Sequence, residues 1–140
     1  MATRLLFVDD NKLMLKCVGL CSDKLHNLEV KTAASAEHAL ELDKAQGPFD
    51  IIISDYMMPG MDGVKLLRKM KSERPSLLCF LQSNGGQDLN IFQAIKDGVI
   101  ASFFDKPMLA VEIEEMLELA WFNFQERTHT GATGEAVSCW

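Results

Sequence analysis

The chain has 140 residues and a formal net charge of −6 at pH 7, with 48% hydrophobic and 24% charged residues. This length favours a single domain, and the composition is that of a globular protein rather than of a low-complexity or collagen-like chain. The acidic balance argues against a nucleic-acid-binding surface, which is normally basic. No apolar stretch approaches the roughly 18 residues that a membrane span needs, and the N-terminus lacks the plan of a signal peptide, so we expect a cytoplasmic protein.

Short apolar runs alternate with helical patterns along the chain. The apolar runs predict strands that are buried on both faces. In chain order, these runs are residues 5–8, 28–33, 50–54, 77–81 and 100–104. After each run comes a stretch with the periodicity of an amphipathic helix. In chain order, these stretches are residues 13–21, 35–44, 64–72, 87–97 and 109–124.

Strands that alternate with helices predict parallel β-α-β units, so we expect an α/β fold whose sheet is covered by helices on both faces. Residues 1–124 are predicted to form this one domain. Residues 125–140 carry Gly, Thr, Ser and Glu without periodicity and are predicted to be a flexible tail. The absence of a linker to a second domain favours a domain that acts on its own over a fragment of a longer protein, but the sequence does not separate the two.

Polar residues follow the ends of four predicted strands. Asp9 and Asp10 come after the first strand, Asp55 after the third, Ser83 after the fourth and Lys106 after the fifth. Because ligands of open α/β sheets bind at the carboxyl ends of the strands, we expect these side chains to meet there. Clustered carboxylates repel one another, and a hard divalent cation such as Mg²⁺ would relieve this repulsion through its preference for oxygen ligands.

This set of residues suits phosphoryl transfer. An aspartate can attack phosphorus and form an aspartyl-phosphate, and the transfer needs mainly positioning and charge stabilisation. Mg²⁺ and Lys106 would supply the stabilisation, and the Ser83 hydroxyl a hydrogen bond to a phosphoryl oxygen. The sequence has no Walker A motif and no nucleotide-binding glycine pattern, and its three histidines do not lie at strand ends. The phosphoryl group is therefore expected to come from another molecule.

Four short motifs in this order resemble the receiver (phosphoacceptor) domain of two-component response regulators. They are Val8-Asp9-Asp10-Asn11, the nine-residue segment Asp55-Tyr56-Met57-Met58-Pro59-Gly60-Met61-Asp62-Gly63, Ser83, and Lys106-Pro107. The resemblance covers roughly residues 3–122. It implies a flavodoxin-like receiver fold, with a five-stranded parallel sheet in the order 2-1-3-4-5 and five flanking helices.

The resemblance also implies roles for the acidic residues. Asp55 would be the phosphoacceptor. Asp10, Asp55 and the backbone carbonyl of Met57 would bind Mg²⁺, with Mn²⁺ as a substitute, and Asp9 would hold waters of the metal shell. No other cofactor is implied.

Lys106 and Ser83 would bind the phosphoryl oxygens, and Ser83 would also act as a switch together with Phe103, which occupies the position of the switch aromatic residue. Their movement would remodel the face formed by the fourth helix, the fifth strand and the fifth helix. The implied phosphoryl donor is a sensor histidine kinase or a phosphotransfer protein, and the target is an unknown downstream protein. Nucleic acid and membranes are not expected partners, and the chain would be a monomer or a phosphorylation-dependent dimer.

Two alternative functions compete with this one. A receiver-like adaptor that works without phosphorylation is favoured only by Asn84, which replaces the small residue usual after the switch hydroxyl. An aspartate-nucleophile phosphatase is disfavoured because such enzymes usually place a second aspartate where this chain has Met57, and because no cap domain encloses a substrate. We therefore expect a signalling domain that catalyses only its own phosphorylation and dephosphorylation.

Overall fold

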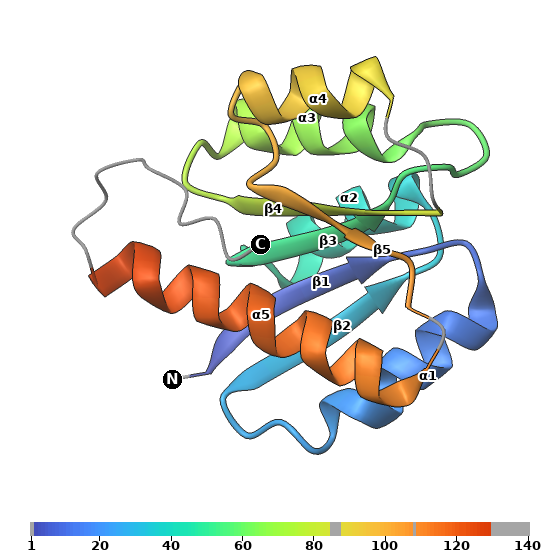
Figure 1. Cartoon of the computed structure of the whole chain (residues 1–140), viewed down its shortest axis with the longest axis vertical. Helices are drawn as coiled ribbons and strands as arrows, with labels where there is room; N and C mark the ends of the chain where they lie inside the picture. Colours follow the sequence, from blue (N-terminus) through green and yellow to red (C-terminus); the bar gives the residue numbers. More distant parts are fainter. Residues whose placement is uncertain (1, 85–87, 108, 130–140) are drawn as a thin grey trace.

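The structure is a computed structural model, and it describes residues 2–84, 88–107 and 109–129. Strands and helices alternate along these residues (Figure 1). The strands are β1 (Thr3–Val8), β2 (Leu28–Ala33), β3 (Ile51–Asp55), β4 (Leu78–Ser83) and β5 (Ser102–Asp105). The helices are α1 (Lys12–Ser22), α2 (Ala36–Gln46), α3 (Gly63–Glu73), α4 (Leu89–Lys96) and α5 (Ala110–His129). Of these helices, none has the length and apolar character needed to cross a membrane.

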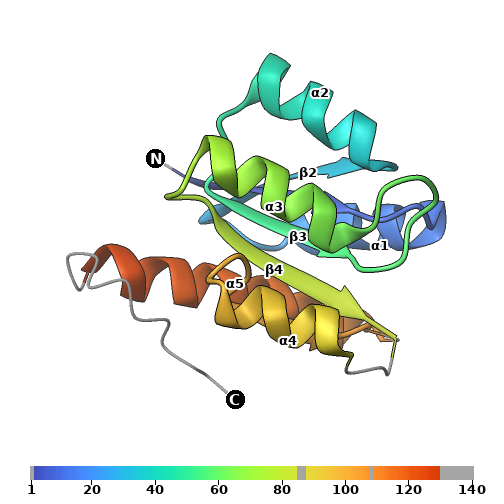
Figure 2. The same cartoon turned by 90° about the horizontal axis from the view of Figure 1, so that it is seen from above.

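All the strand pairs are parallel, and the strand order is β2-β1-β3-β4-β5, which confirms the predicted topology. The central strand β3 is buried along its whole length. Ile51 of β3 lies between Leu5 of β1 and Leu78 of β4 in register. Since parallel strands require crossover connections, the helices cover both faces of the sheet, with α2, α3 and α4 on one face and α1 and α5 on the other (Figure 2).

The core consists of two hydrophobic clusters, one on each face of the sheet. Successive side chains of a strand point to opposite faces, so a single strand serves both clusters. Leu6 and Val8 of β1 pack with α2, α3 and α4, whereas Leu5 and Phe7 pack with α1 and α5. This two-sided burial explains why the strands are continuous apolar runs in the sequence.

Side-chain caps determine where the helices next to the strand ends begin. Asn11, Ser35, Asp62 and Asp88 precede α1, α2, α3 and α4, and each accepts a hydrogen bond from the backbone N–H three residues later. The cap of α1 directly follows Asp10, and the cap of α3 closes the loop after Asp55. Capping therefore fixes the length of the two loops that carry the acidic residues.

Most element boundaries differ from the sequence-based expectation by one or two residues, and two of the differences affect the interpretation. The sequence ends the fourth predicted strand at residue 81, but Gln82 and Ser83 belong to β4, because they pair with Phe104 and Asp105 of β5. The predicted flexible tail begins at residue 125, yet α5 continues to residue 129. Within this continuation, Gln125 Nε2 donates to Thr3 Oγ1 at 3.4 Å, which connects the helix to the start of β1. Residues 130–140 of the predicted tail lie outside the described residues.

Candidate functional site

Four of the predicted site residues meet at the carboxyl-terminal edge of the sheet. Asp9 and Asp10 follow β1, Asp55 ends β3 and Lys106 follows β5. Carboxylate oxygens of the three aspartates lie within 4.8 Å of one another. A cavity of about 410 Å³ opens at this edge. It is lined by Asp10, Asn11, Asp55, Tyr56, Met57, Asn84 and Lys106.

The Lys106 ammonium is shared between two of the carboxylates. Its Nζ lies 3.1 Å from Asp55 Oδ2 and 3.4 Å from Asp9 Oδ2. Burial by itself lowers the pKa of Lys106, but the hydrogen bond to Asp55 and the charges of Asp55 and Asp9 outweigh it, so this pKa lies above its ordinary value. Lys106 therefore stays charged and compensates only part of the negative charge of the cluster.

The Asp55 carboxyl is nearly buried, and this burial destabilises its ionised form. Burial raises the pKa of Asp55 above its ordinary value, and the charges of Asp9 and Asp10 raise it further, while the hydrogen bond with Lys106 opposes the rise. A bound cation would stabilise the ionised cluster. Because the clustered donors are all carboxylate oxygens, they fit Mg²⁺ or Mn²⁺ better than a metal that prefers sulfur or nitrogen.

The two predicted switch residues lie on neighbouring strands. Ser83 is buried at the end of β4, where its carbonyl oxygen accepts a hydrogen bond from the Lys106 backbone N–H at 3.0 Å. Phe103 on β5 is half-buried and packs against the cluster under α2, α3 and α4. Its neighbour Phe104 faces the opposite cluster and lies against Phe80, with 5.3 Å between ring centroids. Phe104 is thus a core residue, and Phe103 is the one that retains partial exposure.

Gln82 is a residue of the site that sequence reasoning missed. It is fully buried, and its Nε2 donates to Asp9 Oδ2 at 2.8 Å. The available signal was a polar residue directly after the apolar run of β4 and before Ser83, but the same pattern is typical of a turn. Its pairing with Asp55 of β3 on one side and Phe104 of β5 on the other shows that Gln82 is inside the sheet.

Tyr56 joins the loop after β3 to the start of α4. Its hydroxyl donates to Asp88 Oδ2 at 2.6 Å and accepts a hydrogen bond from Asn90 Nδ2 at 3.2 Å. Asp88 also caps α4, because its Oδ1 accepts from the Ile91 backbone N–H at 3.0 Å. These hydrogen bonds connect the residue that follows Asp55 to the first turn of α4.

Replacing Tyr56 with phenylalanine should raise the pKa of Asp88. The hydrogen bond from Tyr56 is the main reason that the pKa of Asp88 lies below its ordinary value, followed by the hydrogen bond from the Ile91 backbone. Loss of a donor to the ionised form moves a carboxyl pKa upward. NMR titration of the Asp88 carboxyl measures this shift, and Asn90→Ala is a control that leaves the tyrosine donor in place. An Asp88 pKa that is the same in Tyr56→Phe and in the parent protein would contradict the link.

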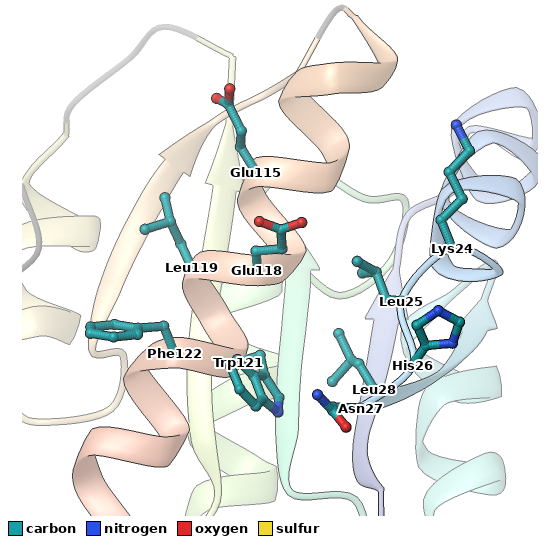
Figure 3. A pocket seen from close by; sticks show the side chains of 10 residues that line it. All are labelled: Lys24, Leu25, His26, Asn27, Leu28, Glu115, Glu118, Leu119, Trp121 and Phe122. Carbon is teal, nitrogen blue, oxygen red and sulfur yellow. The ribbon is translucent and has the colours of Figure 1, made fainter.

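A second cavity, of about 690 Å³, lies between α5 and the segment that joins α1 to β2 (Figure 3). Trp121 of α5 extends toward Asn27 of that segment and toward Leu28, the first residue of β2. Trp121 is partly buried against the core, whereas Phe122 is 46% exposed. The acidic cluster lies outside the lining of this cavity, which offers mainly an apolar surface. The chemistry described above therefore belongs to the sheet edge.

Comparison with known proteins identifies the family. The chain matches the response regulator receiver domain over residues 5–118. It belongs to this family. The receiver is 32% identical over 119 residues to the chemotaxis protein CheY of Listeria monocytogenes, a match that covers 84% of this chain and 97% of that protein. The family and the fold predicted from the sequence are thereby confirmed.

Other relatives are longer proteins. The receiver is 32% identical over 121 residues to the sensor kinase CckA of Brucella abortus, with coverage of 84% of this chain but 13% of that protein. It also spans 30% and 31% of two protein-glutamate methylesterases/protein-glutamine glutaminases that it matches. Receiver domains are signalling domains that bind Mg²⁺ at an acidic aspartate cluster and interact with histidine kinases or phosphotransfer proteins.

Solved structures show the same fold. A receiver domain protein from Clostridium thermocellum superposes with a TM-score of 0.77 at 24% identity, covering 91% of this chain and 98% of that chain. The receiver domain of an HD domain-containing protein from Pseudomonas fluorescens Pf-5 has a TM-score of 0.75 at 28% identity, with coverage of 90% and 99%.

Proposed function

We propose that this receiver accepts a phosphoryl group on Asp55 from the phosphohistidine of a sensor histidine kinase or a phosphotransfer protein. The observation that carries this proposal is the setting of Asp55. Its carboxylate lies in a cluster of three, 3.1 Å from the Lys106 ammonium, and it lines a cavity of about 410 Å³ at the edge of the sheet. A nucleophile with a cation beside it and space in front of it is what phosphoryl transfer needs.

In the proposed reaction, a carboxylate oxygen of Asp55 attacks the phosphorus atom of the phosphoimidazole. The new P–O bond forms as the P–N bond breaks, and the histidine nitrogen keeps the electron pair of the broken bond. Lys106 then leaves the carboxylates and pairs with a phosphoryl oxygen, and the Ser83 hydroxyl donates a hydrogen bond to another oxygen. Both residues act by stabilising the charge of the transferred group.

The residues that would hold Mg²⁺ are Asp10, Asp55 and the Met57 carbonyl, with Asp9 binding waters of the ion. Bound there, the ion would supply positive charge that offsets the three carboxylates and the phosphoryl oxygens. Asp10 is exposed and lines the cavity, whereas Asp9 is fully buried, which suits a direct role for the first and an indirect role for the second.

We further propose that the output is a contact with another protein through the face of α4, β5 and α5. Ser83 and Phe103 would change position when Asp55 is phosphorylated, and Tyr56 offers an additional link to α4. Exposed apolar side chains on α4 and α5 support a protein partner, because such groups mark interaction surfaces. They are Leu89 and Phe92 of α4 and Val111 of α5. The receiver would act as a monomer or as a phosphorylation-dependent dimer.

No catalytic activity toward a separate substrate is proposed. Met57 stands two residues after Asp55, and its apolar side chain is 72% exposed at the cavity. A thioether cannot serve as the general acid or base that a phosphatase would need at this position.

The test is the intact mass of the protein after incubation with Mg²⁺ and acetyl phosphate. We expect one phosphoryl adduct on the parent protein, and none on Asp55→Asn or after chelation of the metal. Asp97→Asn removes an exposed carboxylate of α4's C-terminal cap and should keep the adduct. If the parent protein binds Mg²⁺ in calorimetry but never gains the adduct, the proposal is wrong and a phosphorylation-independent adaptor is favoured.

A further inference from the structure

Gln82 occupies a position that is unfavourable for a polar side chain. It is 0% exposed, and within the part of the chain that the structure describes its Oε1 has no hydrogen-bond partner. An unpaired buried acceptor destabilises a fold, so an aliphatic residue would suit this place in the sheet better unless the amide nitrogen makes a contribution that offsets the loss.

The orientation of the Gln82 amide follows from its neighbour. Nε2 lies 2.8 Å from Asp9 Oδ2, and rotating the amide by half a turn would bring two acceptor oxygens together. The donor therefore faces Asp9, and the unpaired oxygen is the consequence. The side-chain contribution of Gln82 that offsets this loss is therefore its hydrogen bond to Asp9.

Asp9 is fully buried, and protein groups donate to both of its carboxylate oxygens. Its Oδ1 accepts from the Asn11 backbone N–H at 2.9 Å. Its Oδ2 has two neighbours, the Gln82 amide at 2.8 Å and the Lys106 ammonium at 3.4 Å. Lys106 is shared with Asp55, the proposed phosphoacceptor. In the proposed reaction Lys106 turns to the phosphoryl group, so Asp9 loses this donor. Gln82, in contrast, has Asp9 as its hydrogen-bond partner.

We propose that Gln82 is a positioning residue that holds the Asp9 carboxylate while Lys106 moves from the carboxylates to the phosphoryl group. This inference rests on the proposed function. A neutral amide is suited to the task because it donates to Asp9 without adding a positive charge that would compete with a divalent cation. Without Gln82, the departure of Lys106 leaves the Asn11 backbone N–H as the one remaining protein donor to this buried carboxylate among the described residues.

The experiment compares binding of Mg²⁺ alone with binding of Mg²⁺ and beryllofluoride, an anion that mimics a phosphoryl group. Gln82→Met keeps the length of the side chain but removes the donor. We expect it to weaken beryllofluoride binding roughly tenfold or more, the value of one hydrogen bond to a charged group, and to leave the affinity for Mg²⁺ alone nearly unchanged. Calorimetry measures both affinities. Thr3→Val, which removes a buried polar group at the opposite end of the sheet, is the matched control and should change neither.

Equal beryllofluoride affinities of Gln82→Met and the parent protein would overturn the inference. An equal loss for Mg²⁺ alone would also overturn it, because a purely structural defect affects both states. Failure of the parent protein to bind beryllofluoride would instead contradict the proposed function.

If Gln82→Met does not fold, NMR of the parent protein gives the test. The side-chain amide protons of Gln82 should remain protected from solvent exchange both with and without beryllofluoride. Loss of this protection on beryllofluoride binding would show that Gln82 does not hold Asp9 in that state, and would overturn the inference.

Discussion

Replacing Lys106 with methionine should destabilise the protein by about 3 kcal/mol at neutral pH when no divalent cation is present. The substitution leaves Asp9 and Asp55 without an ammonium that lies 3.4 Å and 3.1 Å from their oxygens. The side chains of these aspartates are 0% and 7% exposed, so water replaces the lost partner only in part. Urea denaturation in the presence of a chelator measures the loss.

The loss of stability caused by Lys106→Met should become smaller as the pH falls. Burial already raises the pKa of Asp55, and the loss of the lysine raises it further. A carboxyl whose pKa is higher in the folded state than in the unfolded state favours folding as the pH decreases through that pKa. Protonation of Asp55 thus removes one of the uncompensated charges.

Mg²⁺ should restore most of the stability of Lys106→Met and bind more tightly than to the parent protein, because a competing cation is gone. Phosphorylation by acetyl phosphate should nevertheless slow by about a hundredfold, since one donor to the transferred group is lost. Arg68→Met, which removes an exposed ion pair with Asp97 at 2.9 Å, is the control and should have little effect on stability or phosphorylation. If Lys106→Met is as stable as the parent protein without metal, Lys106 does not stabilise the charges of Asp9 and Asp55, and the prediction is wrong.

Replacing Gly63 with alanine should destabilise the protein by about 3 kcal/mol and weaken Mg²⁺ binding. A methyl group on Gly63 would overlap the backbone carbonyl oxygen of Asp55 and would lie 2.9 Å from Leu81 Cδ1. Both neighbours belong to buried strands in the centre of the sheet, so neither can move away without disturbing the core. Any shift of the Asp55 backbone also displaces the carboxylate of the site.

The matched control for Gly63→Ala is Gly19→Ala in α1. A methyl group on Gly19 meets nothing within 4 Å, and alanine favours a helix over glycine by about 1 kcal/mol. This variant should therefore be slightly more stable than the parent protein. Urea denaturation compares the two, and a Gly63→Ala protein that is as stable as Gly19→Ala would show that the loop after β3 tolerates the added methyl.

The sequence alone determined the order of elements and the meeting of the acidic residues. Apolar runs identify the strands because both faces of a parallel sheet are buried, and local caps such as Asn11 and Asp62 locate the helix starts. In a parallel sheet every strand has its carboxyl end at the same edge. A residue at the end of a strand, such as Asp55, or just after one, such as Lys106, is for this reason placed at the site in space.

The tertiary structure decided which additional groups reach that edge. Gln82 is 73 residues from Asp9, and Tyr56 is 32 residues from Asp88. Nothing in the local sequence distinguishes Gln82 from a turn residue, and Gly63 reads as an ordinary helix start. Their importance comes from burial between strands that pair over long distances in the chain. Exclusion of water makes a single amide donor or a missing methyl group decisive, and only the packed structure shows where water is excluded.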